Sequence, residues 1–150
     1  MNKRNNPYNK NYNLKDSNFL EDYWLRYKKI LFDSRDDKGL IDLRNQILLT
    51  QRKGGKLIFV GNGASASLAS HAATDFTKQA KIKAISFNDH NLITALSNDF
   101  GYDMWVVKAL EFYANPLDKV IFISVSGNSK NLVNGLKFAN KIALSNASFT

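Results

Sequence analysis

The sequence has no cysteine, only two histidines and no long apolar run. The lack of cysteine excludes disulfides, thiolate metal sites and a cysteine nucleophile, and it is compatible with a reducing compartment. No apolar run approaches the ~20 residues that span a bilayer, and the first residues lack the apolar centre of a signal peptide. We therefore expect a cytoplasmic protein that makes no use of a membrane.

Acidic residues are also scarce, with 13 Asp and Glu against 21 Lys and Arg and a net charge of +8. Such an excess raises the hypothesis of nucleic-acid binding. The lysines, however, are spread thinly along the chain and form no basic run or basic-aromatic motif. Solubility and attraction of an anionic metabolite explain the charge equally well, so nucleic acid is the less favoured partner.

The 150 residues, 44% of them hydrophobic, suit one globular domain with a proper core. Residues 1–13 are rich in Asn and Lys, and we expect a mobile tail there. Residues 14–53 show the periodicity of a helical pair, and residues 54–150 alternate between strand and helix patterns. The first helix has a broad apolar face whose exposure would be costly, so we expect a homo-oligomer. That face comprises Leu20, Tyr23, Trp24, Tyr27, Ile30 and Leu31.

Two junctions between a strand and a helix carry the functional signal. The apolar run 120–123 ends in Ser124 and a polar turn through Ser129, and a helical pattern follows from Leu132. The first amides of a helix have no intrahelical partner and attract anions. The hydroxyls of Ser126 and Ser129 can complete a phosphate cradle. In the alternative interpretation Ser129 is only an N-cap.

The second junction has the same design. The strand pattern 56–60 runs directly into Gly61, Asn62, Gly63, Ala64 and Ser65, and then a helix begins. Glycine lets the backbone approach a ligand closely, while Asn62 and Ser65 offer side-chain hydrogen bonds. Two such turns at the carboxyl ends of parallel strands predict a ligand site between them.

The helix after Gly63 places His71 and Asp75 one turn apart on its polar side. These two residues are candidate functional groups, and the alternative is an ordinary solvated His–Asp pair. The opposite side carries small and apolar residues suited to packing on a sheet: Ala69, Ala72, Ala73, Phe76 and Ala80.

Further alternation completes the predicted fold, a parallel doubly wound sheet. We expect a strand at 83–87, the start of a fourth strand at 141–145, a short helix at 92–96 and a longer one at 104–114. A polar loop at 88–91 is expected to cap the short helix and to leave His90 solvated. Residues 98–103 are expected to form a polar turn, with Asn98 and Asp99 as helix caps or as ligands for sugar hydroxyls.

These motifs together resemble the sugar isomerase (SIS) family, and specifically its phosphoheptose isomerase branch. The resemblance covers roughly residues 15–145 in the correct order and implies a flavodoxin-like three-layer sandwich preceded by a helical pair. It is carried by four motifs: Gly61 to Ser65, His71 with Asp75, Asn98 to Asp103, and Ser124 to Ser129.

The resemblance implies an aldose–ketose isomerase acting on sedoheptulose 7-phosphate, for the heptose of surface polysaccharide. Ser65, Ser124, Ser126 and Ser129 would hold the phosphate, and Asn62 and Asp99 would contact the sugar. Gly63 and Asn98 belong to the same substrate-binding motifs.

The chemistry implied by the resemblance needs a base that moves a proton through an enediol(ate). Asp75 stands where the family normally has Glu, and His71 matches a position that ligates zinc in some members. A zinc ion at His71 and Asp75 is therefore an option, although no cofactor is required. Relatives of this kind assemble as tetramers with sites between subunits.

Family members continue through another strand and a closing helix with a Gln and a second catalytic His, and this sequence has neither. Two hypotheses follow. In one, the chain is a fragment or a shortened form of the isomerase, with the α/β domain incomplete at its C-terminal end. In the other, it is a non-catalytic module that binds sugar phosphates or another protein, as the initiator-associating proteins of this scaffold do.

Overall fold

The computed structural model describes residues 14–33 and 36–150, so the predicted tail at 1–13 lies outside the described residues. The chain divides into two compact units, with the boundary between Leu40 and Ile41. Among the described helices, none is both long enough and apolar enough to cross a bilayer.

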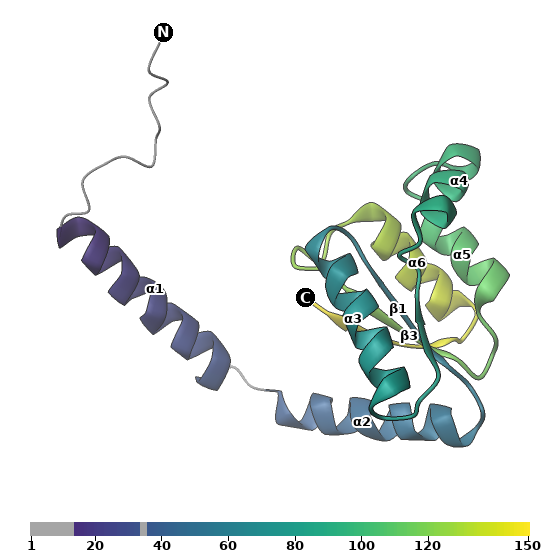
Figure 1. The fold of residues 1–150 in the computed structure, drawn as a ribbon, viewed down its shortest axis with the longest axis horizontal. Coiled ribbons are helices and arrows are strands. Elements are labelled where there is room, and N and C mark those ends of the chain that lie inside the picture. The colour runs from purple at the N-terminus through teal and green to yellow at the C-terminus, as the bar shows by residue number, and fades with distance from the viewer. Residues whose placement is uncertain (1–13, 34–35) are drawn as a thin grey trace, which may run out of the picture. The chain divides into compact units, whose positions relative to one another are not determined.

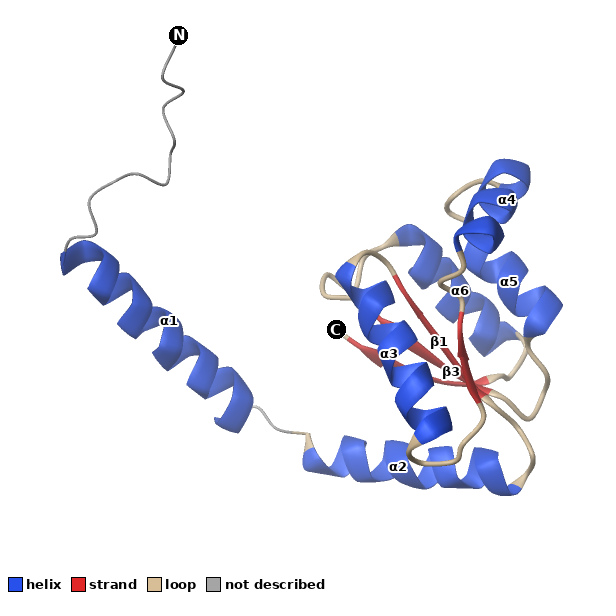
Figure 2. Cartoon of the chain, viewed as in Figure 1, coloured by secondary structure: helices blue, strands red, loops and turns tan. Residues whose placement is uncertain are grey.

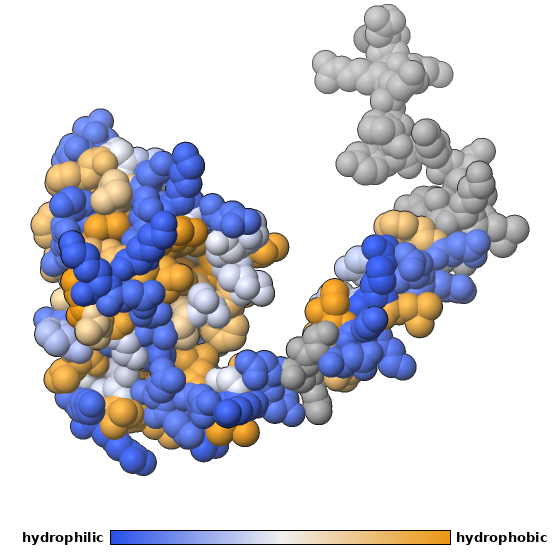
Figure 3. Space-filling view, turned by 180° about the vertical axis from the view of Figure 1, so that it is seen from behind, coloured by the Kyte–Doolittle hydropathy of each residue, from blue (hydrophilic) through white to orange (hydrophobic). Residues whose placement is uncertain are grey.

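The first unit is dominated by α1 (Leu14–Asp33), which confirms the predicted helix. Aromatic rings line up along it at helical spacing: Phe19 stacks on Tyr23 with centroids 6.5 Å apart, and Tyr23 on Tyr27 at 6.0 Å. Trp24 meets Tyr23 edge-on at 5.3 Å. Hydrophobic side chains thus lie at the surface of α1 beside hydrophilic ones (Figure 3).

The second unit contains a four-stranded parallel sheet in the order β2-β1-β3-β4 (Figure 2). After α2 (Asp37–Arg52), strands and helices alternate, which confirms the predicted doubly wound sheet. The remaining elements are β1 (Leu57–Gly61), α3 (Ala64–Lys78), β2 (Ala84–Ser86), α4 (His90–Phe100), α5 (Trp105–Tyr113), β3 (Lys119–Ile123), α6 (Lys130–Lys141) and β4 (Ser145–Phe149).

Helices cover both faces of the sheet, so β1 is buried along its whole length (Figure 1). Leu57 and Phe59 pack toward α2 and α3, in one core cluster with Ile47 and Ala69. Ile58 and Val60, on the opposite face of the strand, belong to the other cluster and pack toward α4, α5 and α6. This two-sided burial explains why the strand reads as a continuous apolar run.

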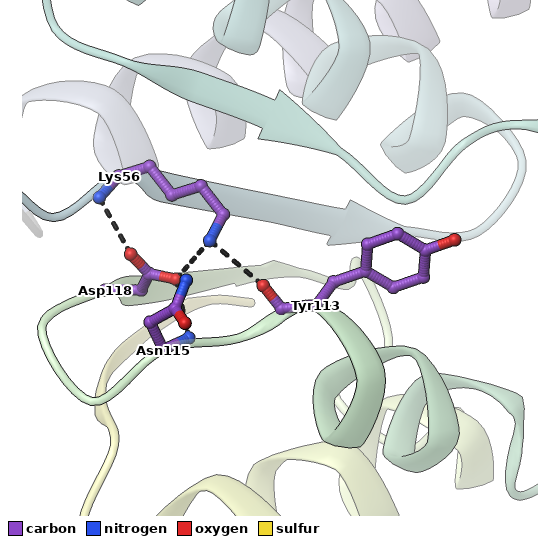
Figure 4. Close-up of polar contacts among 4 residues, drawn as sticks. All are labelled: Lys56, Tyr113, Asn115 and Asp118. Carbon is purple, nitrogen blue, oxygen red and sulfur yellow. Dashed lines mark hydrogen bonds and ion pairs between the residues drawn. The ribbon is translucent and has the colours of Figure 1, made fainter.

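A buried carboxylate ties together the amino ends of β1 and β3 (Figure 4). Asp118 accepts hydrogen bonds from the backbone N–H of Lys56 at 2.9 Å and of Asn115 at 2.8 Å. The Lys56 ammonium forms an ion pair with the same carboxylate and also donates to the carbonyl of Tyr113 at 3.0 Å. The two strand starts are therefore joined by one charged group.

Lys119, the first residue of β3, is fully buried. Its ammonium donates to Gln46 Oε1 at 2.6 Å, to Ser145 Oγ at 3.1 Å and to the Asn146 carbonyl at 3.2 Å. All three acceptors are neutral, and burial lowers the pKa of the Lys119 ammonium. The side chain thus connects α2 to the start of β4.

The outer edge of β2 is occupied by a hydroxyl of α3. Thr77 Oγ1 accepts from the backbone N–H of Ala84 at 3.2 Å and donates to its carbonyl, also at 3.2 Å. Because β2 pairs with β1 on its other side, both edge-facing groups of Ala84 are satisfied.

Three predicted boundaries were wrong. Helix α4 is longer than the predicted 92–96 and includes His90, Asn98 and Asp99, so the polar turn is confined to the residues from Gly101 onward. Asp89 does cap this helix, as expected, by accepting from the Leu92 N–H at 3.0 Å. The helix can continue through Asn98 and Asp99 because Leu96 stays in the core while the polar residues of α4 face outward.

The other two errors concern helix ends. The last strand, β4, begins only at Ser145 and not at Lys141, because the amphipathic pattern of α6 runs on to Lys141. Ala80 lies beyond the end of α3 and is exposed, while Ala69 and Ala73 face the sheet as predicted.

Candidate functional site

A cavity of about 250 Å³ opens at the carboxyl ends of β1 and β3. These strands are neighbours, but the chain first leaves β1 for β2 on one side and returns to β3 on the other. Such a switch point is where open α/β sheets bind ligands. The cavity is lined by residues of both predicted turns, including Asn62, Ser65, Ser124, Ser126 and Ser129.

The first turn needs its glycines for steric reasons. A Cβ at Gly61 would lie 2.6 Å from the carbonyl oxygen of Ser65, so only glycine lets α3 start this close to β1. Gly63 holds the N-cap position of α3 with φ +52°, a conformation that L side chains rarely adopt. The buried Ser65 therefore reaches the cavity from the first turn of α3.

The second turn presents its serines from the end of β3. The Ser124 N–H bonds to the Phe149 carbonyl at 2.9 Å, which fixes this residue to the sheet. Ser126 Oγ accepts from the Asn128 N–H at 3.3 Å. Ser129 occupies the N-cap position of α6, yet its side chain makes no capping hydrogen bond. The side chain of Ser129 is therefore not used for capping, and Ser129 lines the cavity.

An asparagine pair joins the two turns. Asn62 and Asn131 exchange two amide hydrogen bonds, each 2.9 Å long. The hydroxyl of Tyr102 also donates to Asn62 Oδ1 at 3.3 Å. Asn131 lies in the first turn of α6 and is buried. The contacts thus connect the end of β1, the loop after α4 and the start of α6 at one side of the cavity.

His71 and Asp75 are neighbours on α3, as predicted, with His71 Nε2 3.2 Å from Asp75 Oδ2. Both side chains are exposed, at 79% and 51%, and neither lines the cavity. The described residues contain no group of three or more His, Cys, Asp or Glu placed to hold a metal. Zinc usually takes four ligands, so His71 and Asp75 do not by themselves complete a zinc site.

Asn98 and Asp99 do not line the cavity. Asn98 donates to the carboxylate of Asp99 at 2.9 Å, and both are exposed in the last turn of α4. The second half of the same motif approaches the site instead. Asp103 lies 3.7 Å from the Lys130 ammonium, and its carbonyl accepts from Asn134 at 3.0 Å. These contacts hold the loop that carries Tyr102 against α6.

Sequence reasoning gave no role to Asn131 or Tyr102. Asn131 follows the serine turn in a stretch of polar residues, and nothing in that pattern distinguishes a buried amide from a solvated one. Its proximity to Asn62 depends on the pairing of β1 with β3, which places residues 69 positions apart in contact.

Curated proteins with similar sequences point to one family. A probable phosphoheptose isomerase of Thermoplasma acidophilum is 38% identical over 117 residues, which cover 74% of this chain and 64% of that protein. The phosphoheptose isomerase of Pelobacter propionicus is 36% identical over 126 residues, covering 78% of this chain and 67% of that protein. The chain belongs to the phosphoheptose isomerase family. No protein-family model matches it.

Solved structures of the family share the fold. The phosphoheptose isomerase from Neisseria gonorrhoeae superposes with a TM-score of 0.78 at 24% identity, over 91% of this chain and 74% of that one. The chain spans less than two thirds of the length of several relatives, 64% for Thermoplasma acidophilum and 56% for Chlorobaculum tepidum.

Proposed function

We propose that the protein is a sugar-phosphate isomerase that interconverts sedoheptulose 7-phosphate and an aldoheptose 7-phosphate, for the heptose of surface polysaccharide. The observation that supports this proposal best is the cavity at the switch point. Four serines from two turns line it, Ser65, Ser124, Ser126 and Ser129, beside the amino ends of α3 and α6. Hydroxyls and helix amino ends together favour a phosphate group.

The proposed reaction divides the substrate between two places. The serines hold the phosphate on C7, and Asn62 contacts the sugar. The reacting carbons, C1 and C2, are at the other end of the substrate, so a base outside the phosphate cavity is consistent with the chemistry. Asp75 takes a proton from C1 of the ketose and returns it to C2 through an enediol(ate), while a proton passes from O1 to O2. His71 contacts the Asp75 carboxylate and orients it.

Replacing the base tests the proposal directly. Asp75→Asn keeps the shape of the side chain but cannot accept the proton, so turnover of sedoheptulose 7-phosphate should fall at least about 100-fold. Protection against heating by the same compound should remain, because the serines still bind the phosphate. Asp42→Asn, an exposed change on α2, serves as the control with unchanged turnover. Full activity of Asp75→Asn would exclude Asp75 as the base.

A second candidate is a module that binds sugar phosphates without converting them. It is favoured by the exposure of His71 and Asp75 and by the lack, among the described residues, of a third His, Cys, Asp or Glu grouped with them. Stabilisation by sedoheptulose 7-phosphate without product, with and without added zinc, would select this function over the isomerase.

We also propose a cytoplasmic homo-oligomer, a tetramer, in which a second copy covers the aromatic face of α1. That face is exposed in the single chain, with Trp24 at 61%. Burial of several aromatic rings supplies the main driving force for association.

A further inference from the structure

Asn62 has its hydrogen-bonding capacity almost completely assigned by its neighbours. Its Oδ1 accepts from Asn131 Nδ2 at 2.9 Å and from the Tyr102 hydroxyl at 3.3 Å, which uses both lone pairs. Its Nδ2 gives one N–H to Asn131 Oδ1 at 2.9 Å. Within the described part of the chain, no side chain or backbone group accepts the second N–H.

The two amides also fix each other's orientation. Reversing either one would bring oxygen against oxygen and nitrogen against nitrogen at hydrogen-bond distance, which is repulsive. Asn131 is only 2% exposed, so water cannot readily replace Asn62 as its partner. The oxygen of Asn62 is therefore held away from any ligand, and the remaining N–H is the group that Asn62 offers to the cavity it lines.

We propose that Asn131 is a positioning residue that holds Asn62 as an obligate hydrogen-bond donor to an oxygen of the substrate. Asn131 does not line the cavity and acts only through Asn62. This inference rests on the proposed function, because it assigns Asn62 to the sugar rather than to the phosphate. A donor at this place selects for a carbonyl, an oxyanion or an accepting hydroxyl.

The pair has a second effect on the site. Asn62 directly follows β1 and Asn131 lies in the first turn of α6. These segments form two walls of the cavity, so the paired amides hold the walls at a set separation. The serines sit on backbone that is anchored independently, for example by the Ser124 N–H to Phe149. Loss of the pair should therefore weaken sugar recognition more than phosphate binding.

The test compares Asn131→Ala with Asn146→Ala. Asn146 donates to the amide oxygen of Asn140 at 2.8 Å and does not line the cavity, so it is a matched control from a second Asn–Asn contact. If Asn131→Ala does not fold, Asn131→Ser takes its place. Hydrogen exchange of the Asn62 side-chain amide, followed by NMR, reports the pair itself without any substrate.

We expect Asn131→Ala to speed this exchange about tenfold, which is the factor expected from the loss of one buried hydrogen bond. Calorimetry with sedoheptulose 7-phosphate should show affinity reduced by about the same factor, while affinity for inorganic phosphate stays unchanged. In the Asn62→Ala background, Asn131→Ala should cause no further loss of sugar-phosphate affinity, because Asn131 acts only through the Asn62 side chain, which this background lacks. Asn146→Ala should change none of these quantities.

The outcomes separate this inference from the proposed function. Unchanged exchange in Asn131→Ala would show that the pair does not hold Asn62, and the inference would fail even in an active isomerase. Faster exchange with undiminished sugar-phosphate affinity, or an equal loss in the Asn62→Ala background, would likewise overturn it. If the unmodified protein binds inorganic phosphate but not sedoheptulose 7-phosphate, the proposed function fails, and the sugar assignment of Asn62 fails with it.

Discussion

At the scale of single residues, the fold depends on a few polar side chains that are buried with chosen partners. Lys119 and Asn131 are the clearest, since both are almost wholly buried and both use neutral acceptors or donors. Whether such a group stabilises or destabilises the fold depends on its partners, because an unpaired buried polar group costs about 1–3 kcal/mol. Their effects on stability should therefore be sensitive to conditions that change the charge or the partner.

Lys119 should make stability depend on pH. Its pKa in the folded protein lies below the ordinary value of 10.5, so between these values the unfolded chain binds more protons than the folded one. The free energy of unfolding must then rise with pH in that window and be flat below it. Urea unfolding of the unmodified protein and Lys119→Met at increasing pH up to 10.5 checks this.

The free energy of unfolding of the unmodified protein, minus that of Lys119→Met, should increase as the pH rises through the window. Lys83→Met, at an exposed lysine, provides the control for general effects of lost charge. A difference that stays constant or falls over this range would contradict the assigned cause.

At the scale of elements, the starts of β1 and β3 are held by the Asp118 carboxylate. Asp118→Ala would leave three donors without their acceptor, one of them the Lys56 ammonium. We expect a loss of about 3 kcal/mol in the free energy of unfolding. Asp118→Asn keeps one acceptor oxygen and should lose less. Chemical denaturation of both variants would refute this account if the alanine variant proved as stable as the asparagine variant.

Helices α5 and α6 approach each other closely at Gly135. A Cβ there would lie 2.5 Å from Val106 Cγ1 and 3.2 Å from Phe122 Cε1, both in the core. Overpacking of this kind costs about 1–3 kcal/mol, against a gain of about 1 kcal/mol in helix propensity. Gly135→Ala should therefore lower the melting temperature, and adding Val106→Ala should recover part of the loss. Lys137→Ala, exposed on the same helix, should leave it unchanged.

The order of these elements was predictable from the sequence, but their ends and their contacts were less so. The runs now seen as β1 and β3 are apolar because both faces are covered, and that pattern is visible in the residues. The end of α4 was missed because Asn98 and Asp99 are typical turn residues, although here they lie on the outer face of a helix. The serine turns were predicted as one site, whereas the Asn62–Asn131 contact depends on strand order and packing that no local pattern specifies.

At the scale of the whole molecule, the prediction concerns assembly. Trp24→Glu places a charge within the aromatic face of α1 and should shift the protein toward smaller species, because a buried unpaired charge is costly. Light scattering after gel filtration measures the mass directly. Lys29→Gln lowers the net charge by the same one unit on the same helix, outside the aromatic residues, and should leave the mass unchanged. A constant mass for Trp24→Glu would argue against this face as the subunit contact.

The hydroxyl of Thr77 has a consequence for how this protein resists aggregation. A foreign strand laid along β2 would need the N–H and carbonyl of Ala84, and α3 already holds both. The β2 border of the sheet is therefore closed by a side chain of the protein's own α3. Growth by strand addition, the first step toward fibrils, is hindered at this border.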